Sequence, residues 1–321
     1  PLRRQRQMCI RDSHCHVHRG DRLSGTQLRV DAGSDGRRGM KSLVIGSTST
    51  IGKAVARSLA RLGPVKLAGR READILFDLS QPVLPPGDQA FDVVIHAAAD
   101  FGGAEPDDLM RTEQVNGIGA LAACRLAEHC GARHFILLSS RWAAHQPGDP
   151  YYGIYALSKR HAEELVSLYC QARGMALTIL RISQVYDSQA RCRVHQPLLY
   201  AIGDNAAVGK TVYLYGSNDA RRNYLHLDDL AEICVRVAER RVEGVHNCGH
   251  PQDPRLSEIA QAAFAAFGTP PDIRFVPEKD DIPDLPPFVC SGELFERIGY
   301  APQIGIGEGF ELIKTHREQQ A

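Results

Sequence analysis

From residue 42 onward, short runs of apolar residues alternate along the chain with longer segments of helical periodicity. The runs SLVIG, VKLAG, ILFDL, DVVIHAAA, HFILLSS and ALTILRI have the length and composition of buried strands. Between the first two, Ile51, Val55 and Leu59 share one face of a helix that Gly63 and Pro64 end. Repeated β-α-β units of this kind predict an α/β fold with a doubly wound parallel sheet of the Rossmann type, with helices on both faces.

Segments 106–130 and 155–173 are the longest predicted helices. Beyond about residue 183 the alternation becomes irregular, and the stretch PEKDDIPDLPP at residues 277–287 is rich in proline. Because these pieces are too short for an independent core, we expect a smaller lobe that closes over the carboxyl ends of the strands, where such sheets bind ligands. The predicted organisation is a sheet domain at residues 40–182 and a mainly substrate-binding lobe at residues 183–321, with some lobe segments returning to the sheet.

Residues 1–39 differ from the rest of the chain in their pattern. They are rich in Arg and Gly and have no sustained apolar periodicity, so they cannot bury a core. We expect a disordered or non-native tail here, with Met40 as the native start. The tail contains HCHVH at residues 14–18, but no second pair of ligands with zinc spacing follows, so we predict no metal site.

Composition and charge narrow the functional classes. Of 38 basic and 38 acidic residues, nine and four fall in residues 1–39, which leaves 29 basic and 34 acidic residues in the body. This mildly acidic body argues against nucleic acid or a membrane surface as a partner. No apolar stretch approaches the roughly 18 residues of a membrane helix. Most of the nine cysteines are scattered through helical or core segments, which indicates free thiols and a cytoplasmic protein.

A glycine-containing turn follows the first predicted strand. VIGSTSTIG places Gly46 and Gly52 between that strand and a helix, where a backbone without side chains can approach a pyrophosphate and present helix N-terminal amides to it. Ser49 replaces the middle glycine of a three-glycine fingerprint. An ordinary turn is the alternative, but the strand before it and the helix after it favour a dinucleotide site that includes Thr50 and Ile51.

The end of the second strand bears on which dinucleotide binds. An acidic side chain there would bind the ribose 2′-hydroxyl of NAD, whereas an arginine would accept the 2′-phosphate of NADP. KLAGRRE supplies Arg70 and Arg71 first and Glu72 slightly later, so NADP is favoured over NAD, although Glu72 could still fold back to the ribose. Ala97–Ala99 end another strand with small side chains, which would either let the backbone lie against the cofactor or begin an alanine-rich helix.

The segment YYGIYALSK holds the candidate chemistry. Tyr155 and Lys159 are four residues apart in a helical pattern and therefore share one face. A tyrosine with a pKa of about 10 is a poor base at neutral pH, and a nearby ammonium group lowers that pKa by stabilising the phenolate. Tyr151 and Tyr152 have no such partner. Ser140 ends a strand at the same sheet edge, where its hydroxyl could bond a substrate alcohol or ketone.

In this order the motifs resemble the extended short-chain dehydrogenase/reductase family, also called NAD-dependent epimerase/dehydratases, over roughly residues 41–315. The resemblance implies a catalytic serine, tyrosine, lysine and helical asparagine: Ser140, Tyr155, Lys159 and Asn116. It also implies that Asp78 and the following Leu79, in FDLS, lie near the adenine of NAD(P). Further matches are LRISQVY at 180–186, RRNYLHLDDLA at 221–231 and GVHNCG at 244–249.

Members of that family largely act on nucleotide-linked sugars and are commonly homodimers. The resemblance therefore implies a small-molecule substrate of this kind, bound by Gln184 and by Arg222, which would meet the diphosphate. The chain departs from the family on the substrate side, because Gln184 replaces an asparagine and Asp187 a glycine. Arg141 and Trp142 replace the Asp-Glu pair with which sugar 4,6-dehydratases eliminate water, so dehydratase chemistry is disfavoured.

The sequence leaves three functions open. The favoured one is an NAD(P)-dependent nucleotide-sugar epimerase, in which Tyr155 exchanges a proton while a hydride leaves a carbinol carbon and returns to its other face. The second is an NADP-dependent reductase of a ketone or aldehyde that is not nucleotide-linked. The third is a non-enzymatic dinucleotide-sensing regulator, which would keep the fold but would not need a tuned tyrosine.

Overall fold

A seven-stranded parallel sheet forms the centre of the computed structural model, which describes residues 39–87 and 89–320; the HCHVH cluster and nearly all of the tail lie outside these residues. The strand order is β10-β6-β5-β4-β1-β2-β3, which confirms the predicted doubly wound fold. The order reverses between β1 and β4, and ligands of such sheets bind in the crevice at this reversal. The strands are β1 (Ser42–Ile45), β2 (Val65–Gly69), β3 (Ile75–Leu76), β4 (Val93–His96), β5 (His134–Ser140), β6 (Ala176–Ile182) and β10 (Gly244–Cys248).

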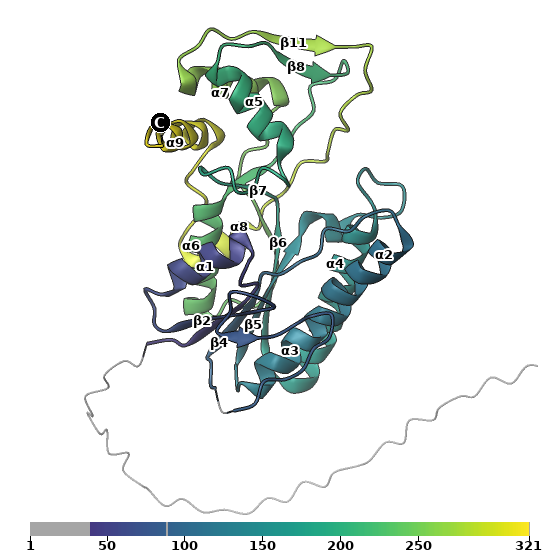
Figure 1. Cartoon of the computed structure of the whole chain (residues 1–321), viewed down its shortest axis with the longest axis vertical. Coiled ribbons are helices and arrows are strands. Elements are labelled where there is room, and N and C mark those ends of the chain that lie inside the picture. The colour runs from purple at the N-terminus through teal and green to yellow at the C-terminus, as the bar shows by residue number, and fades with distance from the viewer. Residues whose placement is uncertain (1–38, 88, 321) are drawn as a thin grey trace, which may run out of the picture. The chain divides into compact units, whose positions relative to one another are not determined.

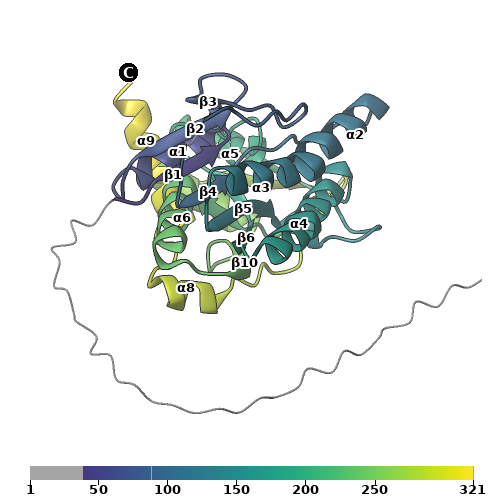
Figure 2. The same ribbon diagram turned by 90° about the horizontal axis from the view of Figure 1, so that it is seen from below.

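Helices cover both faces of the sheet (Figures 1 and 2). One face packs against α1 (Thr50–Leu59), α6 (Leu227–Arg240) and α8 (Gly292–Ile298), and the other against α3 (Gly119–His129) and α4 (Ile154–Arg173). Successive strand residues alternate between the two layers, since side chains of a strand point to opposite faces. Both layers are apolar, which explains why the strands read as continuous hydrophobic runs.

A smaller lobe lies beyond the carboxyl ends of the strands (Figure 1). In it, α5 (Pro197–Ala207), α7 (Leu256–Phe267) and α9 (Ile306–Glu318) pack with the two-stranded parallel sheet of β8 (Val212–Tyr215) and β11 (Ile273–Val276). These elements bury an apolar cluster of their own that includes Tyr200, Phe264 and Phe310. The expectation that they are too short for an independent core is therefore wrong, because three helices bury their apolar faces on one another.

Three further differences from the predicted elements affect the site. The helix predicted at residues 106–130 is divided into α2 (Pro106–Glu113), a π-helical turn (Gln114–Ile118) and α3. A short parallel pair, β7 (Gln184–Tyr186) with β9 (Tyr224–His226), follows the end of β6 and adjoins the lobe. A single 3₁₀ turn, Arg141–Ala144, directly follows β5.

The described residues also bear on two sequence-based expectations, about membrane helices and about the cysteines. None of their helices is both long and apolar enough to cross a membrane. Their seven cysteines are free, and six of them are buried.

Candidate active site

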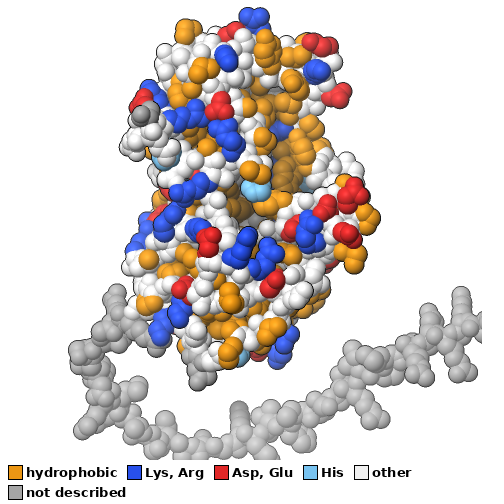
Figure 3. Space-filling model, in the orientation of Figure 1, with side chains coloured by type: hydrophobic (Ala, Val, Ile, Leu, Met, Phe, Trp, Pro, Cys, Tyr) orange, Lys and Arg blue, Asp and Glu red, His pale blue; other side chains and the backbone are white. Residues whose placement is uncertain are grey.

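One large pocket opens at the carboxyl ends of the central strands, between the sheet and the lobe. Its volume is about 1170 Å³, somewhat more than the roughly 300–1,000 Å³ of most small-molecule pockets. Figure 3 shows a hollow between the lobe and the sheet domain, with hydrophobic side chains on its walls. Most of the predicted site residues line the pocket: Gly46, Ser49, Thr50, Ile51, Arg70, Asp78, Leu79, Ala97, Ala98, Ala99, Ser140, Tyr155, Lys159, Gln184 and Arg222. Gly52 and Asn116 lie outside the lining.

The turn after β1 requires its two glycines. Gly46 has a φ of 124°, and a Cβ there would lie 3.0 Å from the backbone nitrogen of Ala98. A Cβ at Gly52 would overlap the carbonyl oxygen of Gly46. Ser49 needs no such freedom, because it is the extended N-cap of α1 and its hydroxyl accepts a hydrogen bond from the Gly52 amide at 3.2 Å. The open backbone and the start of α1 fit the pyrophosphate of NAD(P).

The end of β2 presents arginines to the pocket. Arg70 and Arg71 both line it, and neither has an ion-pair partner among the described residues. The Ser47 hydroxyl donates to the Arg71 carbonyl at 2.6 Å, which fixes the turn. Glu72 instead forms an ion pair with Lys53 at 2.7 Å outside the pocket.

Two further segments that are predicted to contact the cofactor contain Asp78 and Ala97–Ala99, and both line the pocket. Burial would raise the pKa of Asp78, but hydrogen bonds from Ser80 and the charge of Arg70 lower it, so the carboxylate is ionised at neutral pH. Ala97–Ala99 follow β4 without helical structure and line the pocket, so the alternative of an alanine-rich helix start is wrong. The next residue, Asp100, is held by the amide side chain of Asn116.

The structure brings Ser140, Tyr155 and Lys159 together. Ser140 is the last residue of β5, and Tyr155 lies in the first turn of α4. Lys159 is 4% exposed, with its Nζ 5.9 Å from the centre of the Tyr155 ring. The same Nζ donates to the carbonyl of Leu138 at 3.0 Å, which binds α4 to β5. An ammonium group has three donors, so two remain for other partners.

Burial has the largest effect on the pKa values of Tyr155 and Lys159. It raises the pKa of Tyr155 to about 12, and the Ser140 hydroxyl opposes the shift. It also lowers the pKa of Lys159 to about 8, while Glu163 raises it. The expectation that the lysine sets a lowered tyrosine pKa therefore needs correction for the protein alone, because loss of hydration raises that pKa more than the Ser140 hydroxyl lowers it.

Asn116 lies outside the pocket lining and connects two segments beside it. Its Oδ1 accepts from the Asp100 amide at 2.8 Å, and its Nδ2 donates to the Asp100 carbonyl at 2.7 Å and to the Ser158 hydroxyl at 3.0 Å. It is 3% exposed and lies in the π-helical turn, an irregularity that is frequent at functional sites. Asn116 therefore links the loop after β4 to α4, and the catalytic role that the resemblance implies for it stays a prediction.

Two residues that depart from the family on the substrate side have different surroundings. The side-chain amide of Gln184 lines the pocket and donates to Gln196 at 2.9 Å. Asp187 is 4% exposed, and its carboxylate accepts hydrogen bonds from the Cys192 amide and the Tyr200 hydroxyl. Asp187 therefore shapes the loop before α5 and does not face the pocket.

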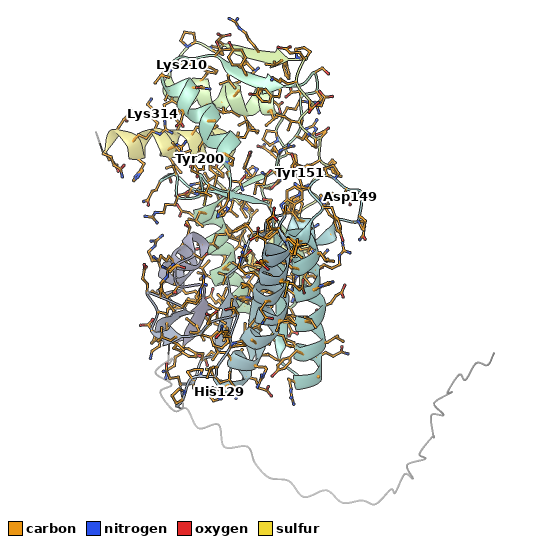
Figure 4. All side chains as sticks on the ribbon, turned by 45° about the vertical axis from the view of Figure 1, so that its right-hand side comes forward. His129, Asp149, Tyr151, Tyr200, Lys210 and Lys314 are labelled. Atoms are coloured by element: carbon orange, nitrogen blue, oxygen red, sulfur yellow. The ribbon has the colours of Figure 1, made fainter. Side chains whose placement is uncertain are left out.

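Arg222 is buried at the pocket wall beneath the proline-rich stretch. Its guanidinium donates to the Pro283 carbonyl at 3.0 Å and to the Tyr151 hydroxyl at 3.3 Å. Tyr151 has a φ of 61°, which is uncommon for a residue other than glycine. Figure 4 shows Tyr151 beyond the N-terminal end of α4, on the side toward the lobe. Of the three tyrosines in YYGIYALSK, Tyr151 and Tyr155 line the pocket and Tyr152 does not.

Residues 42–249 match the family described as NAD dependent epimerase/dehydratase. The chain belongs to this family. It is 25% identical over 245 residues to UDP-glucuronic acid decarboxylase 1 of Danio rerio, which covers 70% of the chain and 56% of that relative. It is 23% identical over 250 residues to a probable UDP-glucuronate 4-epimerase of Rhizobium meliloti (strain 1021), with 68% and 72% covered. The chain thus spans only about half the length of the first relative.

Solved structures agree with this fold. UDP-glucose 4-epimerase of Thermotoga maritima, solved with UDP-glucose, has a TM-score of 0.69 at 19% identity and covers 88% of this chain and 100% of its own. RMD of Pseudomonas aeruginosa, complexed with NADPH, has a TM-score of 0.71 at 19% identity with the same coverage. The family that residues 42–249 match is described as NAD dependent.

Sequence reasoning missed several residues of the pocket of this family member. Phe101, His195, Ile282 and Leu285 line it, although no motif marks them. Phe101 is two residues beyond Ala99, so its position near the pocket could have been inferred from the sequence. The other three come from the lobe, and only the folded chain brings them to the sheet edge.

The buried amine of Lys159 predicts a pH dependence of stability. Its pKa of about 8 lies below the ordinary 10.5, so between these values the unfolded chain holds a proton that the folded chain has released. The free energy of unfolding therefore rises with pH in this window. Relative to Lys159→Met, wild type should gain up to about 1.4 kcal/mol per pH unit between about pH 8 and 10, measured by urea denaturation.

The exposed Lys210, labelled in Figure 4, provides the matched control, since Lys210→Met removes a lysine from the surface of the lobe. A difference between wild type and Lys159→Met that stays flat or falls over this range would contradict the burial of a titrating amine.

Proposed function

We propose that this family member transfers a hydride to or from a carbinol carbon of a nucleotide sugar, with Tyr155 as the acid and base. The supporting observation is that Ser140, Tyr155 and Lys159 meet the Gly46 turn in one pocket of about 1170 Å³, which has room for a dinucleotide and a second ligand. NAD(P), when bound, supplies the group that accepts or donates the hydride.

The side chains divide the remaining work. Ser140 orients the substrate oxygen, and Tyr155 exchanges a proton with it. With a pKa of about 12, Tyr155 is protonated at neutral pH and ready to donate to a ketone oxygen. Proton removal from an alcohol requires that pKa to fall, which Lys159 and the positive charge of an oxidised nicotinamide favour. The two further donors of Lys159 suit the hydroxyls of the nicotinamide ribose.

The substrate class is proposed from the relatives and from the pocket wall. Relatives are named for UDP-glucuronate and UDP-glucose chemistry, and Arg222 offers a guanidinium to a diphosphate. The two residues after Ser140 are Arg141 and Trp142, and neither is a carboxylate. Arg141 donates a hydrogen bond to the Pro286 carbonyl, and Trp142 lines the pocket. We therefore favour epimerisation over elimination of water. A reductase is the second candidate, because the raised pKa of Tyr155 suits proton donation.

Removal of one hydroxyl tests the catalytic assignment. Tyr155→Phe should keep the affinity for NAD(P), measured by fluorescence titration, since the ring and Lys159 remain. Turnover of UDP-glucuronate or UDP-glucose should fall by about 100- to 10,000-fold, the usual contribution of a general acid or base. Tyr152→Phe is the matched control, because Tyr152 lies outside the pocket lining and three residues away.

Equal turnover in wild type and Tyr155→Phe would remove Tyr155 from the chemistry. Cofactor binding without turnover of any nucleotide sugar or simple ketone in wild type would favour the regulator.

The surroundings of Arg70 and Arg71 predict a preference for NADP over NAD. Wild type should bind NADPH more tightly than NADH, because Glu72 is held by Lys53 while both arginines line the pocket. Arg70→Ala should weaken NADPH binding by about 10- to 100-fold, the value of one or two charge-assisted hydrogen bonds. Binding of NADH should stay the same in this variant.

Arg57→Ala is the control for the loss of charge, since Arg57 is exposed on α1 away from the pocket. Tighter binding of NADH than of NADPH by wild type would overturn the preference.

A further inference from the structure

Three aromatic rings are stacked in the pocket, and they come from three separate segments. The Phe101 ring lies on the Tyr155 ring, with centroids 5.2 Å apart and planes 12° from parallel. The His195 ring lies 3.9 Å from Phe101, at 26°. All three line the pocket. Phe101 thus contacts both the proposed acid and base and a ring from the loop before α5.

The loop that carries Phe101 is held firmly. The Asp100 carboxylate accepts hydrogen bonds from the Gly102 amide at 2.8 Å and from the Thr112 hydroxyl at 2.7 Å, and it pairs with Arg111 at 2.9 Å. Asn116 bonds both the amide and the carbonyl of Asp100. These contacts fix the backbone on which Phe101 stands, and so fix the direction from which its ring meets Tyr155.

The loop that carries His195 is organised by a buried carboxylate. Asp187 accepts from the amides of Gln189, Arg191 and Cys192, at 3.2, 3.2 and 2.9 Å. The Tyr200 hydroxyl, from α5, bonds the same carboxylate at 2.9 Å. These bonds fix the loop to α5 of the lobe, and His195 contacts Phe101 of the sheet domain.

Phe101 is 55% exposed even with its two stacked neighbours. A large apolar side chain held at the mouth of a pocket by a braced loop calls for a function, because burying it elsewhere would be more favourable. Its near-parallel contact restrains the Tyr155 ring, and His195 in turn restrains Phe101.

We propose that Phe101 and His195 form an aromatic clasp that joins the lobe to the sheet domain and positions Tyr155 for proton transfer. This inference rests on the proposed function of Tyr155. Phe101 and His195 are positioning residues in it, and the property that matters in His195 is its flat ring, not its proton. When the clasp is closed, the lobe is held over the reacting hydroxyl and water is kept from it.

Substitutions at His195 separate the ring from the proton. His195→Ala removes both, whereas His195→Phe keeps a ring that can stack and removes the titratable nitrogens. We expect His195→Ala and Phe101→Ala to lower kcat by about 100-fold, the cost of a displacement of about 1 Å at a reacting group. The affinity for NAD(P) should stay unchanged, and His195→Phe should restore most of kcat. Val194→Ala is the control for the loop, since Val194 is 84% exposed.

A second readout needs no turnover. Trp142 is the only tryptophan of the chain and lines the same pocket. Opening of the clasp should make its fluorescence more accessible to acrylamide quenching in His195→Ala and Phe101→Ala, and not in His195→Phe or Val194→Ala.

A kcat of His195→Phe as low as that of His195→Ala would overturn the clasp and assign the proton of His195 to the reaction. Wild-type kcat and quenching in both alanine variants would overturn it as well, while loss of turnover in Tyr155→Phe would leave the proposed function standing. If Tyr155→Phe keeps full turnover, the proposed function fails and the clasp fails with it.

Discussion

The hydrogen bond from Lys159 to the carbonyl of Leu138, at 3.0 Å, is the contact on which the rest of the site depends. It ties α4 to β5 and so places Tyr155 beside Ser140, the last residue of that strand. A second bond acts one turn later, where the Ser139 hydroxyl donates to Glu163 at 2.5 Å. Burying an amine and a carboxylate is costly unless each is bonded, so these pairings also oppose any slip of the helix along the sheet.

The positions of the other site elements follow from that alignment. Asn116 bonds both Asp100 and Ser158, and it thereby sets the loop after β4 at a constant distance from α4. The same loop carries the alanines along the cofactor side and Phe101 on the substrate side. One short segment thus links the proposed dinucleotide site to the lobe. This explains why a π-helical turn, which is unfavourable by itself, is kept at Asn116.

Local spacing predicted what depends on local geometry. The strands, the Gly46 turn and the shared face of Tyr155 and Lys159 follow from periodicity and helical repeat, and the structure has them. The interruption of the helix at Asn116 and the core of the lobe follow from contacts between distant segments, which spacing does not encode. The pKa of Tyr155 is the clearest example of a property that spacing does not encode. Burial of the side chain by distant segments raises it, whatever the spacing to Lys159.

Transfer of a hydride to or from a carbinol carbon of a nucleotide sugar is the step on which the proposed roles of Ser140, Tyr155 and Lys159 depend. The most direct measurement follows deuterium placed at C4 of UDP-glucose or UDP-glucuronate during a single turnover of the protein loaded with NAD(P), with mass spectrometry of the sugar and the nicotinamide. The deuterium should be found on the nicotinamide or at C4 of the epimerised sugar, which chromatography separates from the starting sugar. Deuterium released into water, or complete absence of transfer from both sugars, would contradict it.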